Sequence, residues 1–448
     1  DPHDATPLYL AALTGRDEIC QYLLERGAKC DPESGGDAAR VFYVALTPEL
    51  RRMLREWSLS AATRDPFLDI LRKAFNDPTH ADCFTMIEGE KIHLHYMLLY
   101  ARCPRLANLV EDGGDEGLAQ LRLPVSHAES SKIMSSLLEY LYTGVFETRE
   151  FDMAAEAAHL ALYYNLKSLH GTLEDALERY LSQSQAETLL LSEVGRFRCD
   201  TSDLSLLRQD MTNLARLMST SHADFDDLST FSKVVQWSDT TVVCSDSTWS
   251  LNMFLVCGQS DYFSSALLGG FRESQDSMLD FSHLVPSTDA LSLAIQWMYA
   301  DIFLDDLTTV ESAVDVLEFG AAILCPRLCA YAANTVLIPA VDVGNVFGML
   351  QLSKIHGLER LENRCVQVLA VEFESVATCT ELRTLLAKES AEIVQKGDVC
   401  VSDIPIAAEI RSAIIRSKDA IPKQVQERHL ELLHNVVQET LSKSAEAS

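Results

Sequence analysis

Asp82 and His95 are the two titratable residues whose spacing could support acid–base chemistry. Thirteen residues separate them across an expected hairpin, an arrangement in which a carboxylate can orient an imidazole. A catalytic role would also need a nucleophile and an oxyanion donor, and no motif in the sequence supplies them. We therefore interpret the pair as a partly buried polar contact that fixes the hairpin and the start of the next helix.

Three other groups of side chains could supply metal ligands, but their spacing does not fit a metal site. Two histidines lie two residues apart on a short apolar segment that has no nearby cysteine or carboxylate pair at ligand spacing, and two others, five residues apart on an expected helix, do not share a face. An acidic group lacks the glycine and the distal glutamate of a calcium loop. The groups are His93 with His95, His429 with His434, and Asp224 with Asp226 and Asp227. We predict no metal site.

Motifs for nucleotide binding and hydrolysis are also missing from the sequence. Residues 344–348 come closest to a phosphate-binding loop but lack the third glycine and a Lys-Ser/Thr ending. There is no Gly-x-Ser-x-Gly elbow and no His-Glu-x-x-His helix. We predict that the protein is not an enzyme and needs no cofactor.

The composition is that of an acidic globular protein, and the length suggests about three domains. The 448 residues include 37 Lys and Arg and 66 Asp and Glu, a net charge of −29. Such a charge disfavours binding to nucleic acids and to anionic membranes, and no apolar run is long enough for a membrane span. The twelve cysteines are scattered singly, which favours a reducing compartment. We expect the protein in the cytoplasm and also in the nucleus.

The first 57 residues carry the pattern of a short helical repeat. A capping threonine and a proline open a first helix with two inward residues, a second helix has an apolar stripe, and a glycine can end it. In order, these residues are Thr6, Pro7, Leu8, Ala11, Ile19, Leu23, Leu24 and Gly27. Residues 38–56 look like a second, eroded copy. The Thr-Pro-Leu-Tyr-Leu-Ala opening resembles the ankyrin repeat.

A longer pattern occurs twice, at a spacing of 157 residues. Each copy opens with an aspartate and a strand, continues through a turn and a second strand, and enters an apolar helix. Asp82 corresponds to Asp239 and His95 to Asn252, and the register holds over more than sixty positions. The chain therefore carries two copies of one α+β module. Because Asn252 cannot act as a base, the repeat also argues against a shared catalytic role.

Both copies resemble the BTB/POZ fold. That family has an aspartate opening a strand, a histidine at the exit of the second strand, and a later helix that ends in Tyr-Thr-Gly. The first copy supplies all three, whereas the second has Asn252 at the histidine position. The resemblance implies a signature pocket formed by Asp82 and His95 in one domain and by Asp239 and Asn252 in the other.

The resemblance also implies the domain organisation. The helical pattern after the second copy resembles the BACK region that follows many BTB domains, and the chain as a whole resembles ankyrin-repeat and BTB/POZ domain-containing proteins with two BTB domains. The expected fold is α+β and predominantly helical. The implied segments are ankyrin repeats at 1–57, BTB/POZ domains at 64–182 and 233–334, a linker with one amphipathic helix at 183–232, and a BACK-like region with a C-terminal helix at 335–448.

Phe271 and Glu273 match a short partner-binding motif of the family. In BTB proteins that bind the cullin-3 scaffold, an apolar residue and a glutamate two positions later lie in the loop after this helix pair. The first copy has Gly114-Asp115-Glu116 at the same offset and lacks the apolar anchor. Because aromatic anchors dominate interface energies, the second copy is the better cullin candidate. The alternative is that Phe271 packs within its own domain.

Two functions are consistent with this resemblance. The first is an adaptor that recruits an unknown protein substrate to a cullin-3 RING ubiquitin ligase. The second is an oligomeric scaffold that pairs through BTB surfaces and holds signalling or translation factors without ubiquitylation. The resemblance also implies pairing of BTB domains, either within one chain or between chains. The short connection between the two copies favours pairing within one chain, because it keeps their effective concentration near the millimolar range.

Overall fold

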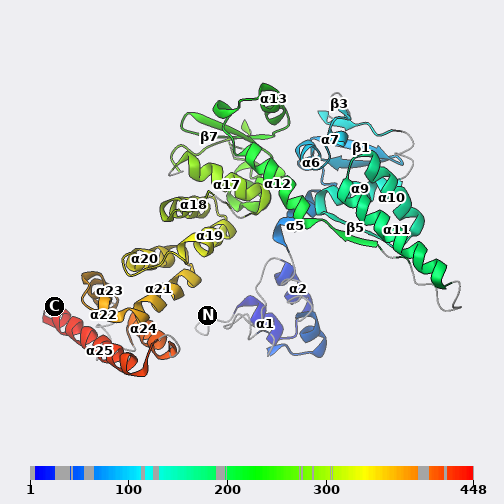
Figure 1. Cartoon of the computed structure of the whole chain (residues 1–448). Coiled ribbons are helices and arrows are strands. Elements are labelled where there is room, and N and C mark those ends of the chain that lie inside the picture. The colour runs from blue at the N-terminus through cyan, green and yellow to red at the C-terminus, as the bar shows by residue number, and fades with distance from the viewer. Residues whose placement is uncertain are drawn as a thin grey trace. The chain divides into compact units, whose positions relative to one another are not determined.

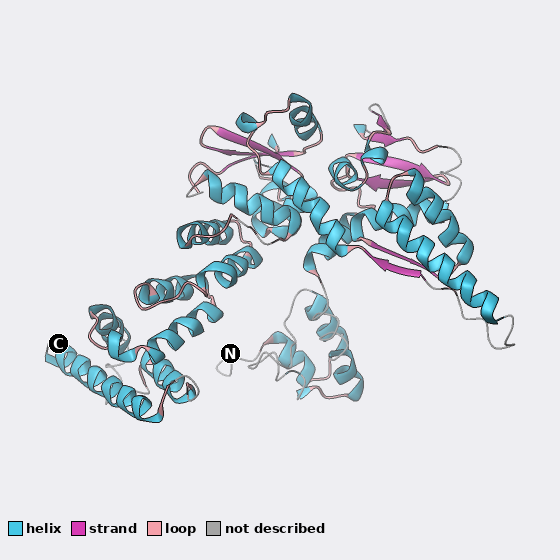
Figure 2. Ribbon diagram, in the orientation of Figure 1, coloured by secondary structure: helices cyan, strands magenta, loops and turns pink. Residues whose placement is uncertain are grey.

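A computed structural model gives the fold of most of the chain, which is mainly helical with a few short strands (Figure 2). It describes residues 6–25, 41, 44–54, 65–111, 117–124, 131–187, 197, 199–271, 273, 276–284, 287–302, 304, 306–391, 403–417 and 421–446. Gly27, part of the expected linker and Gly114-Asp115-Glu116 lie outside these ranges. The chain divides into two compact units, Asp1–Arg72 and Lys73–Ser448 (Figure 1).

The N-terminal unit contains the two helices expected for the repeat. Thr6 caps α1 (Pro7–Leu13), because its hydroxyl accepts a hydrogen bond from the Tyr9 N–H at 3.1 Å. Leu8 and Ala11 pack in one core with residues of α2 (Asp17–Glu25) and of a helix over residues 48–54. The eroded copy contributes Val41, Ala45, Leu50 and Leu54 to this core.

The apolar stripe of α2 differs from the prediction at one position. Ile19 is 51% exposed, whereas the neighbouring Cys20 is fully buried in the core. The helix is thus rotated so that Cys20 and Leu24, four residues apart, share the buried face. A free cysteine is small and apolar enough to fill this position.

The larger unit begins with a module, here called the first module, that covers residues 82–187 and 199–202. Its first sheet has the strand order β2-β1-β4-β3, with β1 and β2 antiparallel and β1 and β4 parallel. Glu88 and Gly89 make the turn of the β1–β2 hairpin with φ of 51° and 86°. Its elements are β1 (Cys83–Ile87), β2 (Glu90–Leu94), α6 (Tyr96–Arg102), α7 (Pro104–Ala107), β3 (Val110–Glu111), β4 (Ala119–Leu121), α9 (Ser131–Thr143), β5 (Val145–Thr148), α10 (Phe151–Tyr163), α11 (Lys167–Glu187) and β6 (Cys199–Ser202).

A second module, residues 228–322, repeats this arrangement. Its sheet has the order β8-β7-β9, in which β7 pairs antiparallel with β8 and parallel with β9, as β1 does with β2 and β4. Two short helices follow the hairpin in both modules. The elements are α13 (Leu228–Gln236), β7 (Thr240–Cys244), β8 (Ser247–Leu251), α14 (Met253–Gln259), α15 (Asp261–Leu268), β9 (Met278–Asp280), α17 (Thr288–Ala300) and α18 (Val310–Ala322).

The segment expected to be a linker is an integral part of the larger unit. Its strand β6 pairs antiparallel with β5 of the first module. Its helix α12 (Leu204–Met218) packs on α6 and α9 of the first module and on α17 and β8 of the second. The polar, Ser-rich composition suggested a connection, but Leu207, Met211 and Leu214 bury one face of α12 between the two modules.

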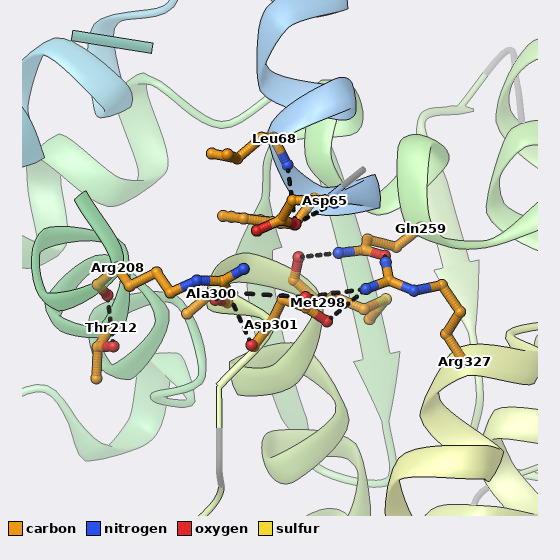
Figure 3. Close-up of polar contacts among 10 residues, drawn as sticks. Asp65, Leu68, Arg208, Thr212, Gln259, Met298, Ala300, Asp301 and Arg327 are labelled. Atoms are coloured by element: carbon orange, nitrogen blue, oxygen red, sulfur yellow. Dashed lines mark hydrogen bonds and ion pairs between the residues drawn. The ribbon is translucent and has the colours of Figure 1, made fainter. Parts of the chain in front are cut away.

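Two arginine contacts fix α12 to both sides. Arg102 of α6 is buried and donates to the Asp210 carboxylate of α12 and to the Leu141 carbonyl. On the other side, Arg208 of α12 donates to the Asp301 carbonyl at 2.9 Å, and Arg327 holds the Asp301 carboxylate with two bonds of 2.9 Å. Figure 3 shows Arg208 and Arg327 reaching Asp301 from opposite sides. The C-terminal end of α17 is therefore clamped between α12 and the following helices.

The C-terminal region is helical throughout its described part. The last helix, α25, is amphipathic, and its apolar face is covered by the same chain. Leu433 and Val437 are buried, and α25 packs on α22, α23 and α24. The elements are α19 (Pro326–Ala332), η3 (Ala333–Leu337), α20 (Val346–His356), α21 (Glu359–Val371), α22 (Phe373–Val376), α23 (Thr380–Ala391), α24 (Pro405–Arg416) and α25 (Lys423–Glu446).

The two histidines of the last helix differ in their exposure to solvent. His429 is buried with its Nδ1 3.1 Å from the Ala370 carbonyl oxygen, whereas His434 is exposed. None of the ten described cysteines forms a disulfide bond. Within the described ranges, no helix is both long and apolar enough to span a bilayer.

We expect that removing divalent metal ions leaves the protein folded. Among the residues placed by the structure, no three His, Cys, Asp or Glu side chains group as metal ligands. Dialysis against a chelator should therefore leave the melting temperature unchanged in differential scanning calorimetry. A fall of several degrees that zinc restores would show that a metal contributes to folding.

Candidate protein-interaction site

The two aspartates of the sequence repeat cap the helix that follows each hairpin. An Asp82 carboxylate oxygen accepts from the Tyr96 N–H at 2.7 Å, and Asp239 accepts from the Met253 N–H at the same distance. Each aspartate thus satisfies a free N–H at the start of α6 or α14. The residues are fourteen positions apart in both modules, so the spacing in the sequence encodes this contact.

Two tyrosines for which no role was predicted complete the pockets. The Tyr142 hydroxyl accepts a hydrogen bond from the backbone N–H of His95 at 2.9 Å and lies 3.0 Å from the ring Nδ1 of His95. The Tyr299 hydroxyl accepts from the Asn252 N–H at 2.6 Å and donates to its side-chain oxygen at 3.2 Å. The signal was available, because Tyr142 and Tyr299 are also 157 residues apart.

The predicted pocket residues are therefore brought together, but not as an acid–base pair. Asp82 is engaged by a helix N–H and His95 by a tyrosine hydroxyl. Both His95 and Asn252 are almost fully buried. These polar contacts fix the start of α6 and of α14.

The two pockets lie where the modules meet. The His95 ring lies 4.0 Å from the Phe254 ring of α14, measured between centroids, and Tyr96 stacks on Trp237 at 4.0 Å with 14° between the planes. The Lys233 ammonium lies 4.9 Å from the centre of the Tyr100 ring. The contact thus joins α6 of the first module to α13 and α14 of the second, all within one chain.

Burial at this contact shifts the pKa values of the pocket residues. It raises the pKa of Asp82 to about 7, against the lowering effect of the Tyr96 N–H, and the charge of Asp239 raises it further. Burial likewise raises the pKa of Asp239 to about 6. For His95, burial lowers the pKa to about 3. Its Nε2 is buried without a hydrogen-bond partner among the described residues, which agrees with a neutral ring.

Asp82→Asn should remove a loss of stability that occurs as the pH rises, and His95→Asn should reduce a loss that occurs as the pH falls. The folded-state pKa of Asp82 is raised from 3.8, so its contribution to stability is lost as the pH rises from about 4 to about 7. Asparagine keeps the oxygen acceptor for the Tyr96 N–H and does not ionise. We expect the free energy of unfolding of Asp82→Asn, relative to that of the native chain, to rise by at least about 1 kcal/mol from pH 4 to pH 8, as measured by urea unfolding.

His95→Asn copies the residue of the second module and serves as the matched variant. The folded-state pKa of His95 is lowered from 6.5 to about 3, so the native chain should lose stability as the pH falls below about 6.5. We expect His95→Asn to reduce this loss at acidic pH and to leave the trend above pH 7 unchanged. Equal pH profiles for the native chain and both variants would contradict the assigned pKa shifts.

The in-chain contact predicts the oligomeric state. A face of α6 that could pair with another chain is already covered by Phe254 and Trp237 of the same chain. We expect static light scattering at micromolar concentration to report the mass of one chain. A dominant dimer whose abundance rises with concentration would show that these faces exchange between chains.

The proposed partner-binding residues lie on another, exposed part of the second module. Helix α15 ends at Leu268, and Gly270 follows with φ of 75°, so the chain turns away from the helix. Phe271 is 59% exposed, and Glu273 is exposed two residues later. Leu268 and Met278 are also about half exposed, at 49% and 47%. Phe271 is therefore not a core residue of its module.

The Phe271 ring lies back over Gly269. A Cβ added to Gly269 would come within 3.0 Å of the ring and 2.2 Å of the Ser265 carbonyl oxygen. Only glycine permits this close approach, so the backbone helps to hold the ring near the end of α15. Glu273 lies close enough to Tyr262 for its charge to raise the pKa of that hydroxyl, together with the larger effect of burial.

Comparison with known proteins identifies two of the expected segments. The BTB/POZ domain model matches residues 71–181, and the ankyrin repeat model matches residues 3–34. The ankyrin repeat-containing protein YIL001W of Saccharomyces cerevisiae is 22% identical over 454 residues, which cover 95% of this chain and 85% of that protein. BTB/POZ domain-containing protein 3 of Schizosaccharomyces pombe is 21% identical over 409 residues, covering 88% and 73%.

A human relative matches a shorter part. Kelch-like protein 38 of Homo sapiens is 26% identical over 149 residues, which cover 33% of this chain and 24% of that protein. The names of the two fungal relatives contain the ankyrin repeat and the BTB/POZ domain, which agrees with the domain matches. The chain therefore contains an ankyrin repeat and, in its first module, a BTB/POZ domain, which are the modules of a protein-interaction adaptor.

Proposed function

We propose that this protein is a non-enzymatic adaptor that recruits a protein substrate to a cullin-3 RING ubiquitin ligase. The single observation that carries the proposal is the exposure of Phe271, whose side chain is 59% exposed, whereas Phe254 of the same module is buried against the first module. An exposed aromatic side chain on a loop is unfavourable in water and suits an interface anchor. The adaptor acts by holding two proteins close together.

The proposal includes the assignment of residues 233–334 as a second BTB/POZ domain. Its support is the repetition of the Asp82 and Tyr142 hydrogen bonds by Asp239 and Tyr299, at the same 157-residue spacing. We also assign residues 335–448 as a BACK-like helical region, since a helical hairpin with buried Leu361 and Cys365 follows the second module. The absence of disulfide bonds among the described cysteines supports a reducing compartment, the cytoplasm or the nucleus.

Co-elution tests the proposal. The full chain and the N-terminal region of cullin-3 are mixed at micromolar concentration and separated by size-exclusion chromatography, each alone and together. We expect an equimolar complex that elutes earlier than either protein. Separate elution at all tested concentrations would reject the cullin adaptor and leave a scaffold without a ubiquitylation role.

A further inference from the structure

A groove runs between α20 and α23 in the C-terminal region. It encloses about 730 Å³, within the size range of ligand-binding clefts. One face of each helix lines it, over the stretches 347–355 and 380–388. Eight residue steps at about 1.5 Å each give a groove about 12 Å long, or roughly two turns of helix.

The two helices forming the groove are held from behind by other elements. Helix α20 packs on α21, and α23 packs on α24 and α25. The groove walls are thus parts of a packed helical region, and their positions do not depend on an occupant. A preformed groove of this kind lowers the ordering cost of binding.

The groove is open, and apolar residues line it together with the polar Gln351, Thr380 and Thr384. Ile355 is 67% exposed, the second most exposed of the large hydrophobic residues described here. Phe347 and Leu385 line the groove and are half-buried. At Gly348 an added Cβ would have no heavy atom within 4 Å, so the floor leaves room for a side chain from outside.

Charged side chains of both signs lie at one end of the groove. The Lys354 ammonium bonds the Glu389 carboxylate at 2.9 Å, which places the C-terminal parts of α20 and α23 side by side. Lys354 and the exposed Lys388 therefore lie at the same end, whereas Glu381 lines the groove near the start of α23. Because Glu389 already compensates Lys354, Lys388 contributes most to the attraction of an acidic group. Two lysines at one end stand out in a chain with a net charge of −29.

We propose that the groove between α20 and α23 binds a short amphipathic helix of a partner protein, with apolar side chains against Phe347 and Ile355 and an acidic side chain at Lys388. The groove length suits the i, i+4, i+7 spacing of the apolar residues on such a helix. This site is separate in sequence and position from Phe271, and the proposal does not depend on the cullin contact.

Fluorescence anisotropy with two synthetic peptides tests the proposal on the full chain. Both peptides are stapled helices of about 15 residues with the same leucine stripe, and one carries glutamates at one end where the other carries glutamines. We expect micromolar binding, with the glutamate peptide about threefold to fivefold tighter, although the net charge of the chain opposes it. Lys388→Gln should remove this preference.

Two exposed isoleucines provide a matched pair of variants. Ile355→Ser removes an apolar contact inside the groove and should weaken both peptides about tenfold. Ile415→Ser changes a 44% exposed isoleucine of α24 that does not line the groove, and it should leave binding unchanged. The Phe271→Ala variant should bind both peptides with the affinity of the native chain. Peptide binding in the groove is then distinguished from cullin-3 binding, which this variant should weaken. No peptide binding, or equal effects of Ile355→Ser and Ile415→Ser, would overturn the proposal.

Discussion

Replacing Phe271 with alanine is expected to weaken cullin-3 binding about thirtyfold or more while leaving the melting temperature nearly unchanged. The side chain is 59% exposed, so its removal costs the folded chain little. At an interface, the loss of an aromatic anchor typically costs about 2 kcal/mol or more, which corresponds to the thirtyfold change. Isothermal titration calorimetry with the N-terminal region of cullin-3 measures the binding, and calorimetric unfolding measures the stability.

Glu273→Ala is the matched control for this experiment. Glu273 is exposed two residues from Phe271, where solvent screens its charge, so its removal should weaken binding by less than about fivefold. The adaptor proposal would lose its residue-level support if Phe271→Ala changed neither binding nor stability. If Phe271→Ala unfolded the second module, the ring would instead act in the core.

Replacing Phe254 with alanine is expected to have the opposite effect, a large loss of stability. Phe254 is 6% exposed and its ring lies 4.0 Å from the His95 ring of the first module. Truncation of a buried phenylalanine costs about 3–5 kcal/mol, because contacts are lost and a cavity remains. We expect a clear fall in the urea midpoint, together with higher-mass species in light scattering if α6 becomes available to another chain.

Phe254→Leu separates loss of volume from loss of the aromatic ring. Leucine fills much of the space, so the expected cost is below about 1.5 kcal/mol. Phe271→Ala, which removes the same group from an exposed position, should cost far less than Phe254→Ala. Equal and small effects of the two alanine variants would show that the contact between the modules is not stable in solution.

Residue types at short spacing were enough to predict the local elements of this protein. Thr6 and Pro7 specify the start of α1, and the fourteen-residue spacing from Asp82 to Tyr96 specifies a capped helix after a hairpin. These features depend on residue types at short spacing, where capping and backbone preferences act. The resemblance of the sequence motifs to the ankyrin repeat and to the BTB/POZ domain is confirmed by the family models.

Which surfaces meet became clear from the folded structure. It showed that α12 lies between two modules, that α25 covers its own region, and that Tyr142 reaches His95 across 47 residues. It also showed that Phe271 is exposed whereas Phe254 is buried, although both are phenylalanines of one module. The type of a residue sets the free energy gained by burying it, but the neighbours that bury it come from distant segments, and local spacing does not specify them.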